Sequence, residues 1–116
     1  MKKILALFLL LLIVGCGASK QEYRIPDITK PEMITLNKHN NQGNIYSISI
    51  SGRGQIDGEA TISLILNGKP YKIKRLSGSI LFQWVGDWYS NSAEIQYEPL
   101  AVKNGNLSLT YHFRDI

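Results

Sequence analysis

The chain has 116 residues, 13 basic and 9 acidic side chains, and a formal net charge of +4. Two of the basic residues, Lys2 and Lys3, stand at the N-terminus, so the rest of the chain is close to neutral. It also lacks the stripe of basic residues interleaved with aromatic ones that a nucleic-acid surface needs, and we expect no nucleic-acid partner. The length is sufficient for one domain with one hydrophobic core.

The N-terminal segment has the pattern of an export signal. Lys2 and Lys3 are followed by an uninterrupted apolar run of eleven residues, from Ile4 to Val14. Crossing a bilayer as a helix takes about 20 apolar residues, so this run is shorter than a permanent span and typical of a signal-peptide core. We therefore predict that residues 1–15 are a cleaved signal peptide.

The end of this segment, Ile13-Val14-Gly15-Cys16, resembles the lipobox of bacterial lipoproteins, in which an aliphatic and a small residue precede an obligatory cysteine. The resemblance implies that the thiol of Cys16 receives a diacylglyceryl group, that a peptidase cuts before Cys16, and that in many bacteria the new amine is acylated. Two or three acyl chains make a durable membrane anchor, whereas one chain binds only marginally. The alternatives are an ordinary signal peptide with a coincidental cysteine, or an uncleaved anchor.

The lipoprotein resemblance also carries an expectation for localisation. In Gram-negative bacteria an aspartate after the lipidated cysteine typically retains such a protein in the inner membrane, and here that position is Gly17. The resemblance then implies the periplasmic face of the outer membrane, or, in other bacteria, the extracellular face of the cell membrane. Cys16 is the only cysteine, so the domain has no disulfide to stabilise it.

Residues 16–44 are predicted to form the lipidated N-terminus and a flexible tether. They mix charges, two prolines and an Asn/Gln/Gly cluster, with no sustained period of two or 3.6 residues. A flexible chain of about 25 residues spans roughly 25 to 30 Å. The segment Glu32–Leu36 (EMITL) leaves two further possibilities, a short strand or packing on the domain.

From residue 45 to residue 116 the pattern is all β. Apolar and polar residues alternate in 45–51 and 93–98, residues 80–85 are almost wholly apolar, and 107–113 alternate again. Two further strands are expected on either side of Asn67-Gly68, which makes six. Six strands joined mostly by short turns predict a small antiparallel meander that forms a β-sandwich or a barrel.

Two Asn-Gly pairs predict hairpin turns, because both central residues of a type I′ turn need positive φ. Pairing outward from Asn67-Gly68 places Leu64 opposite Tyr71 and Ile62 opposite Ile73 on an apolar face. Lys72 and Lys74 then lie on the polar face. The second pair, Asn104-Gly105, is expected to join the last two strands, with a bulge or break at Pro99.

Catalytic and metal-binding signatures are weak. His39, in the predicted tether, and His112, on the polar side of the last strand, lack further ligands at suitable spacing, and both are interpreted as solvated. Asp57 and Glu59 flank a glycine, where turn formation is the simpler role. We therefore predict no enzyme activity, no metal and no cofactor.

The candidate ligand-binding residues are Asp87, Trp88, Tyr89, Lys72 and Lys74. Trp88 and Tyr89 follow the turn signal Gly86-Asp87, where large aromatics either contact a partner or close the end of a barrel. Lys72 and Lys74 would meet an anionic partner, or else protect an edge strand from pairing with other chains. Trp84, within the apolar run, is expected to be buried.

These observations predict a membrane-anchored, non-catalytic binding or interaction module, with an envelope protein or glycan as its partner. The alternative is a small inhibitor or immunity-type lipoprotein that blocks a lytic enzyme, a resemblance of architecture only. An inhibitor needs a protruding loop that fits an active-site cleft, whereas an enzyme needs converging polar groups in a pocket.

Replacing the cysteine tests the anchor. Cys16→Ser removes the sulfur to which the lipid attaches, so we expect an unprocessed precursor that carries no acyl group. Mass spectrometry of the wild-type N-terminus is the matched measurement. A mature wild-type chain that begins at another residue, or that carries no lipid, would contradict the lipoprotein assignment.

Overall fold

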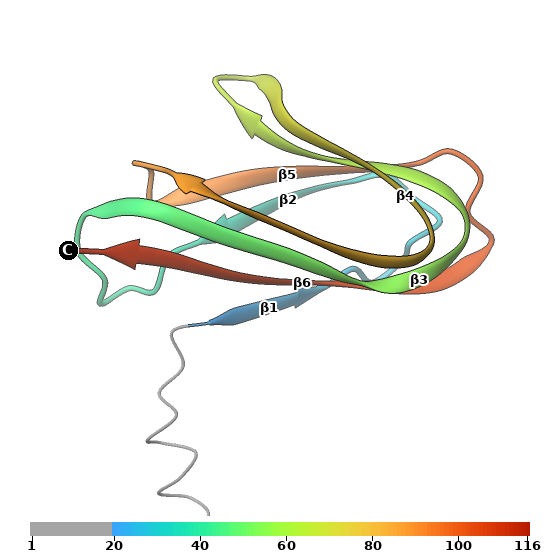
Figure 1. The fold of residues 1–116 in the computed structure, drawn as a ribbon, viewed down its shortest axis with the longest axis horizontal. Helices are drawn as coiled ribbons and strands as arrows, with labels where there is room; N and C mark the ends of the chain where they lie inside the picture. The colour runs from blue at the N-terminus through green and yellow to red at the C-terminus, as the bar shows by residue number, and fades with distance from the viewer. Residues whose placement is uncertain (1–19) are drawn as a thin grey trace, which may run out of the picture.

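The computed structural model describes residues 20–116 and confirms the all-β prediction (Figure 1). The signal peptide and the lipobox, including Cys16, lie outside the described residues. None of the described residues belongs to a helix of the length and apolar character that crossing a bilayer requires. The six strands are β1 (Gln21–Arg24), β2 (Glu32–Asn37), β3 (Ile45–Leu66), β4 (Lys69–Asp87), β5 (Ser92–Pro99) and β6 (Asn104–Asp115).

The long strand β3 connects all parts of the sheet. Along one edge its first half pairs with β6 and its second half pairs with β5, while β4 pairs along the other edge over almost its whole length. The strand order is β1-β6-β3-β5-β2, and every pairing is antiparallel. The resulting sheet curls into a half-barrel (Figure 1).

The curl depends on a bend within β3. The register between β3 and β4 shifts between Ile56 and Glu59, so two residues of β3 have no partner on β4. One of them, Gly58, has φ +132°, and a Cβ at this position would lie 1.7 Å from the carbonyl oxygen of Ala101. Only glycine avoids both the unfavourable backbone conformation and this overlap.

The hydrophobic core fills the concave side of the curled sheet. Because side chains alternate across a strand, β2, β5 and β6 send every second residue along much of their length into the core. The buried phenol of Tyr97 donates a hydrogen bond of 2.6 Å to the carbonyl of Ile28, which fixes the β1–β2 connection against the core. The largest fully buried side chains are Tyr97, Phe113, Leu36, Ile50, Ile62, Ile95, Leu107 and Leu109.

The open side of the half-barrel lies between β1 and β2, and side chains bridge it. Gln21 Nε2 donates to the Asn37 carbonyl at 2.9 Å, and the Tyr23 hydroxyl donates to the Glu32 carboxylate. The bond to Glu32 is the main reason that the pKa of Tyr23 is raised above its usual value. The sheet therefore approaches closure through side chains, without a backbone ladder between β1 and β2.

The tether prediction is wrong for much of residues 16–44. β1 pairs with β6, and β2 pairs with β5 over six residues, so the strand alternative for Glu32–Leu36 is the correct one. Both strands are short, and both lie at edges of the sheet. β2 has only two buried side chains, Ile34 and Leu36, which is too few for a clear periodic signal.

The connection between β2 and β3 is also ordered. Gly43 N–H donates to a carboxylate oxygen of Asp115 at 2.8 Å, and Gln42 Nε2 donates to the other at 3.2 Å. These bonds lower the pKa of Asp115, the backbone bond most strongly. His39 was expected to be solvated, but its Nε2 is buried and has no hydrogen-bond partner among residues 20–116.

The Asn67-Gly68 turn is confirmed, because the two residues have φ of 54° and 77°. The register predicted beyond it is wrong. After two pairs, Leu64 lies opposite Lys72, so Tyr71 is an extra residue on β4. Pro70 stands beside this bulge, since a proline cannot donate a ladder hydrogen bond.

The bulge reverses the faces of β4 near the turn. Lys72 and Lys74 lie opposite Leu64 and Ile62, which point into the core. Tyr71 and Ile73, predicted to be buried, are 53% and 60% exposed.

The predicted hairpin at Asn104-Gly105 does not form, because β5 and β6 both pair with β3 and not with each other. The expected strands at 45–51 and 61–64 are the two halves of β3, and those at 71–74 and 80–85 are parts of β4. Gly78, within β4, lies beside the register shift between β3 and β4 and has φ +60°.

We expect Gly58→Ala to destabilise the domain by about 3 kcal/mol or more, because an unfavourable φ and an overlap with a backbone oxygen add together. Gly68→Ala is the control, because its φ is also positive but no atom lies within 4 Å of the added Cβ. The control should cost about 1 kcal/mol. Urea unfolding of the two variants measures the difference, and equal losses would contradict the role assigned to the bend.

Candidate ligand-binding sites

An aromatic cleft lies between the β3–β4 hairpin and the segment that follows β4. It consists of two adjoining hollows, of about 130 Å³ and 310 Å³, that share Tyr71, Asp87 and Trp88. Four of the five residues predicted from the sequence meet here. The residues that define the aromatic cleft are Leu66, Tyr71, Lys72, Trp84, Asp87, Trp88 and Tyr89.

Trp88 and Tyr89 take different roles in this cleft. Trp88 is only 6% exposed and belongs to the core. Its indole N–H donates to the Ser92 carbonyl at 2.9 Å, and its backbone N–H donates to the Tyr46 carbonyl at 3.2 Å. Tyr89 is 77% exposed. Trp88 thus closes an end of the half-barrel. Of these two aromatic residues, only Tyr89 projects toward solvent.

Trp84 is not fully buried as expected. It packs against the core as a half-buried side chain, and its ring lies 5.0 Å from that of Phe82, tilted by 51°. Part of its surface contributes to a wall of the aromatic cleft. The reason is that β4 borders the sheet, so the end of its apolar run extends beyond the covered core.

Charged groups of both signs lie in the aromatic cleft. Lys72 Nζ is 5.3 Å from the centroid of the Tyr71 ring, within the range of a cation–π interaction. Asp87 contributes a carboxylate to the same cleft. Lys74, which we predicted to belong to the site, lies outside it and lines a separate hollow with Arg75 and Leu76.

The hairpin arm, defined as Lys69–Arg75, is exposed along its entire length. Among the described residues, only β3 pairs with β4, so the outer edge of the arm has no strand partner. Arg75 lies 3.6 Å from the Glu59 carboxylate, but both side chains are exposed, and such pairs contribute little to stability. Lysines on an unpaired edge are typical of strands protected from aggregation.

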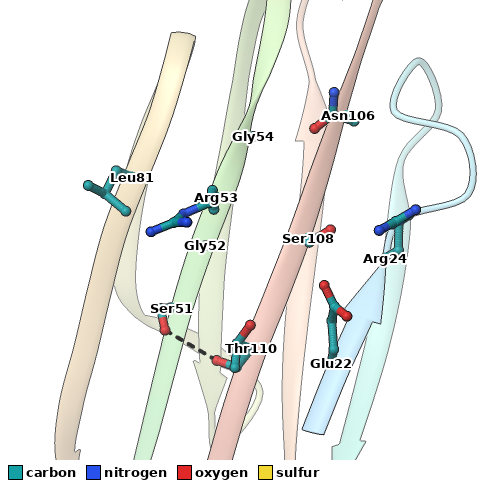
Figure 2. A pocket seen from close by; sticks show the side chains of 10 residues that line it. All are labelled: Glu22, Arg24, Ser51, Gly52, Arg53, Gly54, Leu81, Asn106, Ser108 and Thr110. Atoms are coloured by element: carbon teal, nitrogen blue, oxygen red, sulfur yellow. Dashed lines mark hydrogen bonds between the residues drawn. The ribbon is translucent and has the colours of Figure 1, made fainter. Parts of the chain in front are cut away.

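A second hollow, the polar groove, crosses the outer face of the sheet from β1 to β4 (Figure 2). Its volume is about 520 Å³. The groove could not be predicted from the sequence, because Glu22 and Arg24 fell in the predicted tether and β6 was expected to pair with a different strand. Its lining residues are Glu22, Arg24, Ser51, Gly52, Arg53, Gly54, Leu81, Asn106, Ser108 and Thr110.

Within residues 20–116, no three His, Cys, Asp or Glu side chains come close enough together to hold a metal ion. Asp57 and Glu59 are exposed at the bend of β3, where their backbone carbonyls accept hydrogen bonds from the segment after β5. His112 is half-buried on β6. No protein-family model matches the chain, and a search of curated proteins finds no relative.

The different burial of the two adjacent aromatics gives a stability prediction. Trp88→Ala should destabilise the domain by about 3 to 5 kcal/mol, the usual range for a buried tryptophan. Tyr89→Ala is the neighbouring control and should stay within about 0.5 kcal/mol, as exposed substitutions usually do. Thermal melts of the two variants compare them directly. A Trp88→Ala variant that melts like the wild type would show that Trp88 does not close the core.

Proposed function

We propose that the protein is a bacterial envelope lipoprotein, anchored through lipid on Cys16, whose β-domain is a non-catalytic binding module. The lipobox-like sequence Ile13-Val14-Gly15-Cys16 supports the anchor. The aromatic cleft supports the binding role. Its partner is an envelope protein or glycan.

The observation that carries the proposal is the exposure of large side chains around a hollow. Tyr89, Tyr71 and Leu66 are 77%, 53% and 40% exposed, and all three line the larger part of the aromatic cleft. Concave sites with aromatic walls and a few charged groups are typical of ligand binding. Tyrosine is also enriched among the residues that contribute most to interfaces.

The position of the anchor suits this role. Only four residues, 17–20, separate Cys16 from Gln21, a distance of at most about 17 Å along the chain. Lipid on Cys16 would hold the β1 side of the domain near the membrane. The β3–β4 turn lies on the opposite side of the molecule from β1 (Figure 1). The hairpin end would then face away from the bilayer.

The hairpin arm favours the second candidate, an inhibitor of a lytic enzyme. With the end of β3 it forms the hairpin whose turn lies at the top of Figure 1, where β3 pairs with β5 up to Ile65 and the arm is the free edge of the sheet. Its residues carry four positive charges, from Lys69, Lys72, Lys74 and Arg75. Such an arm has the shape and the charge to enter an acidic active-site cleft.

Crosslinking in the native envelope followed by pull-down tests the proposal. We expect the combined change Tyr71→Ala and Tyr89→Ala to abolish capture of the partner at an unchanged melting temperature, because both side chains are exposed. Tyr46→Ala is the matched control, since Tyr46 is also exposed but lines neither hollow of the cleft. Undiminished capture by the double variant would contradict a role for the cleft.

The same sample separates the two candidates. If the captured partner is a peptidoglycan-hydrolysing enzyme and the wild-type chain lowers its activity, the inhibitor assignment holds. Changing Lys74 and Arg75 to glutamate should then relieve inhibition, because the arm would carry the wrong charge for an acidic cleft. Any other captured partner supports the binding module.

A further inference from the structure

We infer that the polar groove binds the headgroup of a membrane phospholipid, a phosphodiester that carries a primary ammonium. This inference rests on the proposed lipid anchor, because the anchor places the groove near the bilayer. It concerns a different face of the domain from the aromatic cleft.

The cationic groups of the groove are set by the strand register. Arg24 on β1 lies opposite Ser108 on β6, and Ser108 lies opposite Arg53 on β3. The three residues therefore form one row across three strands. Neighbouring strands are about 4.8 Å apart, so the two arginine Cα atoms are about 10 Å apart, on either side of Ser108. Figure 2 shows the two guanidinium groups at opposite sides of the groove.

Neither arginine has a partner within the described part of the chain. Both are exposed, and neither takes part in an ion pair or a side-chain hydrogen bond. Arginine presents several N–H donors in a fixed plane that suits phosphate and carboxylate oxygens. An anion between the two side chains would accept hydrogen bonds from both guanidinium groups, and neither arginine would have to give up an existing partner.

The next row adds hydroxyl groups and one negative charge. Glu22 on β1 lies opposite Thr110 on β6, which lies opposite Ser51 on β3. Two residues along a strand span about 7 Å, so Glu22 lies one repeat from Arg24 on the same face. Its carboxylate points into the groove in Figure 2. In a ligand that carries a phosphate and a nearby ammonium, the phosphate would pair with the row of Arg24 and Arg53, and the ammonium would pair with the carboxylate of Glu22.

The lining of the groove argues against other ligands. No aromatic ring lines it, so a sugar would have no surface to stack on. Two arginines opposed by one glutamate are too few for a nucleic acid, which needs many phosphate contacts. The small side chains Ser51, Ser108 and Thr110 leave the middle of the groove open to a compact headgroup.

Because the lipid anchor already holds the chain at the membrane, weak binding of a headgroup is sufficient to occupy the groove. Exposed arginine–phosphate contacts of this kind give only weak affinity on their own. Once the chain is held by its lipid, headgroup contact becomes an intramolecular event with a high effective concentration. Contact at the groove would fix the orientation of the domain on the membrane.

The test uses the full chain, purified from its host in sugar-based detergent micelles, with NMR of the arginine side-chain Nε–H groups. We expect phosphatidylethanolamine in the micelles to shift the signals of Arg24 and Arg53. Inorganic phosphate at the same concentration should shift them at least tenfold less, and phosphatidylcholine, which has no ammonium N–H, should act weakly. Equal shifts with inorganic phosphate, or none with phosphatidylethanolamine, would overturn the inference.

Variants locate the effect. Arg24→Gln combined with Arg53→Gln should abolish the lipid-dependent shift of the Ser108 amide, and Glu22→Gln should remove the preference for phosphatidylethanolamine over phosphatidylglycerol. Arg114→Gln, on the same strand as Ser108 but outside the groove, should change neither. If Arg114→Gln had the same effect as the double variant, the groove would not be the site. Mass analysis of the same samples reports lipid on Cys16 separately, so failure of the anchor is distinguishable from failure of the groove.

Discussion

The bend of β3 at Asp57–Gly58 is the constraint on which the rest of the domain depends. It allows one strand to pair with β6 before the bend and with β5 after it. With only about a hundred residues and no disulfide, the domain gains most of its stability from a single core. That core forms because the bend turns both halves of β3 around the same buried side chains. A straight β3 would leave β5 and β6 end to end along one edge of a flat sheet with an exposed apolar face.

The two candidate binding sites are consequences of the same bend. β4 follows β3 along its length, so the hairpin end of β4 is carried beyond the core and contributes to the aromatic cleft. Before the bend, β3 lies beside β6, and this arrangement brings Arg53 into one row with Ser108 and Arg24. The hairpin end of the molecule thus carries the aromatic cleft, whereas the outer face near β1 carries the polar groove.

Local signals in the sequence predicted local features well. Alternation identified the strands after residue 45, and Asn67-Gly68 identified the hairpin turn. The pairing of distant strands could not be read in this way, since β6 and β5 join β3 through contacts that no turn signal specifies. The register beyond the turn failed because one bulge at Tyr71 moves every later side chain of the arm to the other face.

The candidate sites were predictable to different degrees. The aromatic cleft was anticipated because large aromatics after a turn signal are conspicuous, although the sequence did not separate buried Trp88 from exposed Tyr89. That difference arises from the indole bond to the Ser92 carbonyl, which depends on how the segment folds back. The polar groove had no local signal, because its lining combines residues from four strands.

Site-specific photo-crosslinking in living cells tests the central claim, that the domain is an anchored binding module with its partner at the hairpin end. A photoreactive amino acid would replace Tyr89 in one strain and Leu100, which is 64% exposed and lines neither the cleft nor the groove, in another. The account predicts one discrete adduct with an envelope protein or glycan from position 89 and none from position 100. Adducts of the same identity and yield from both positions, or none from position 89, would contradict it.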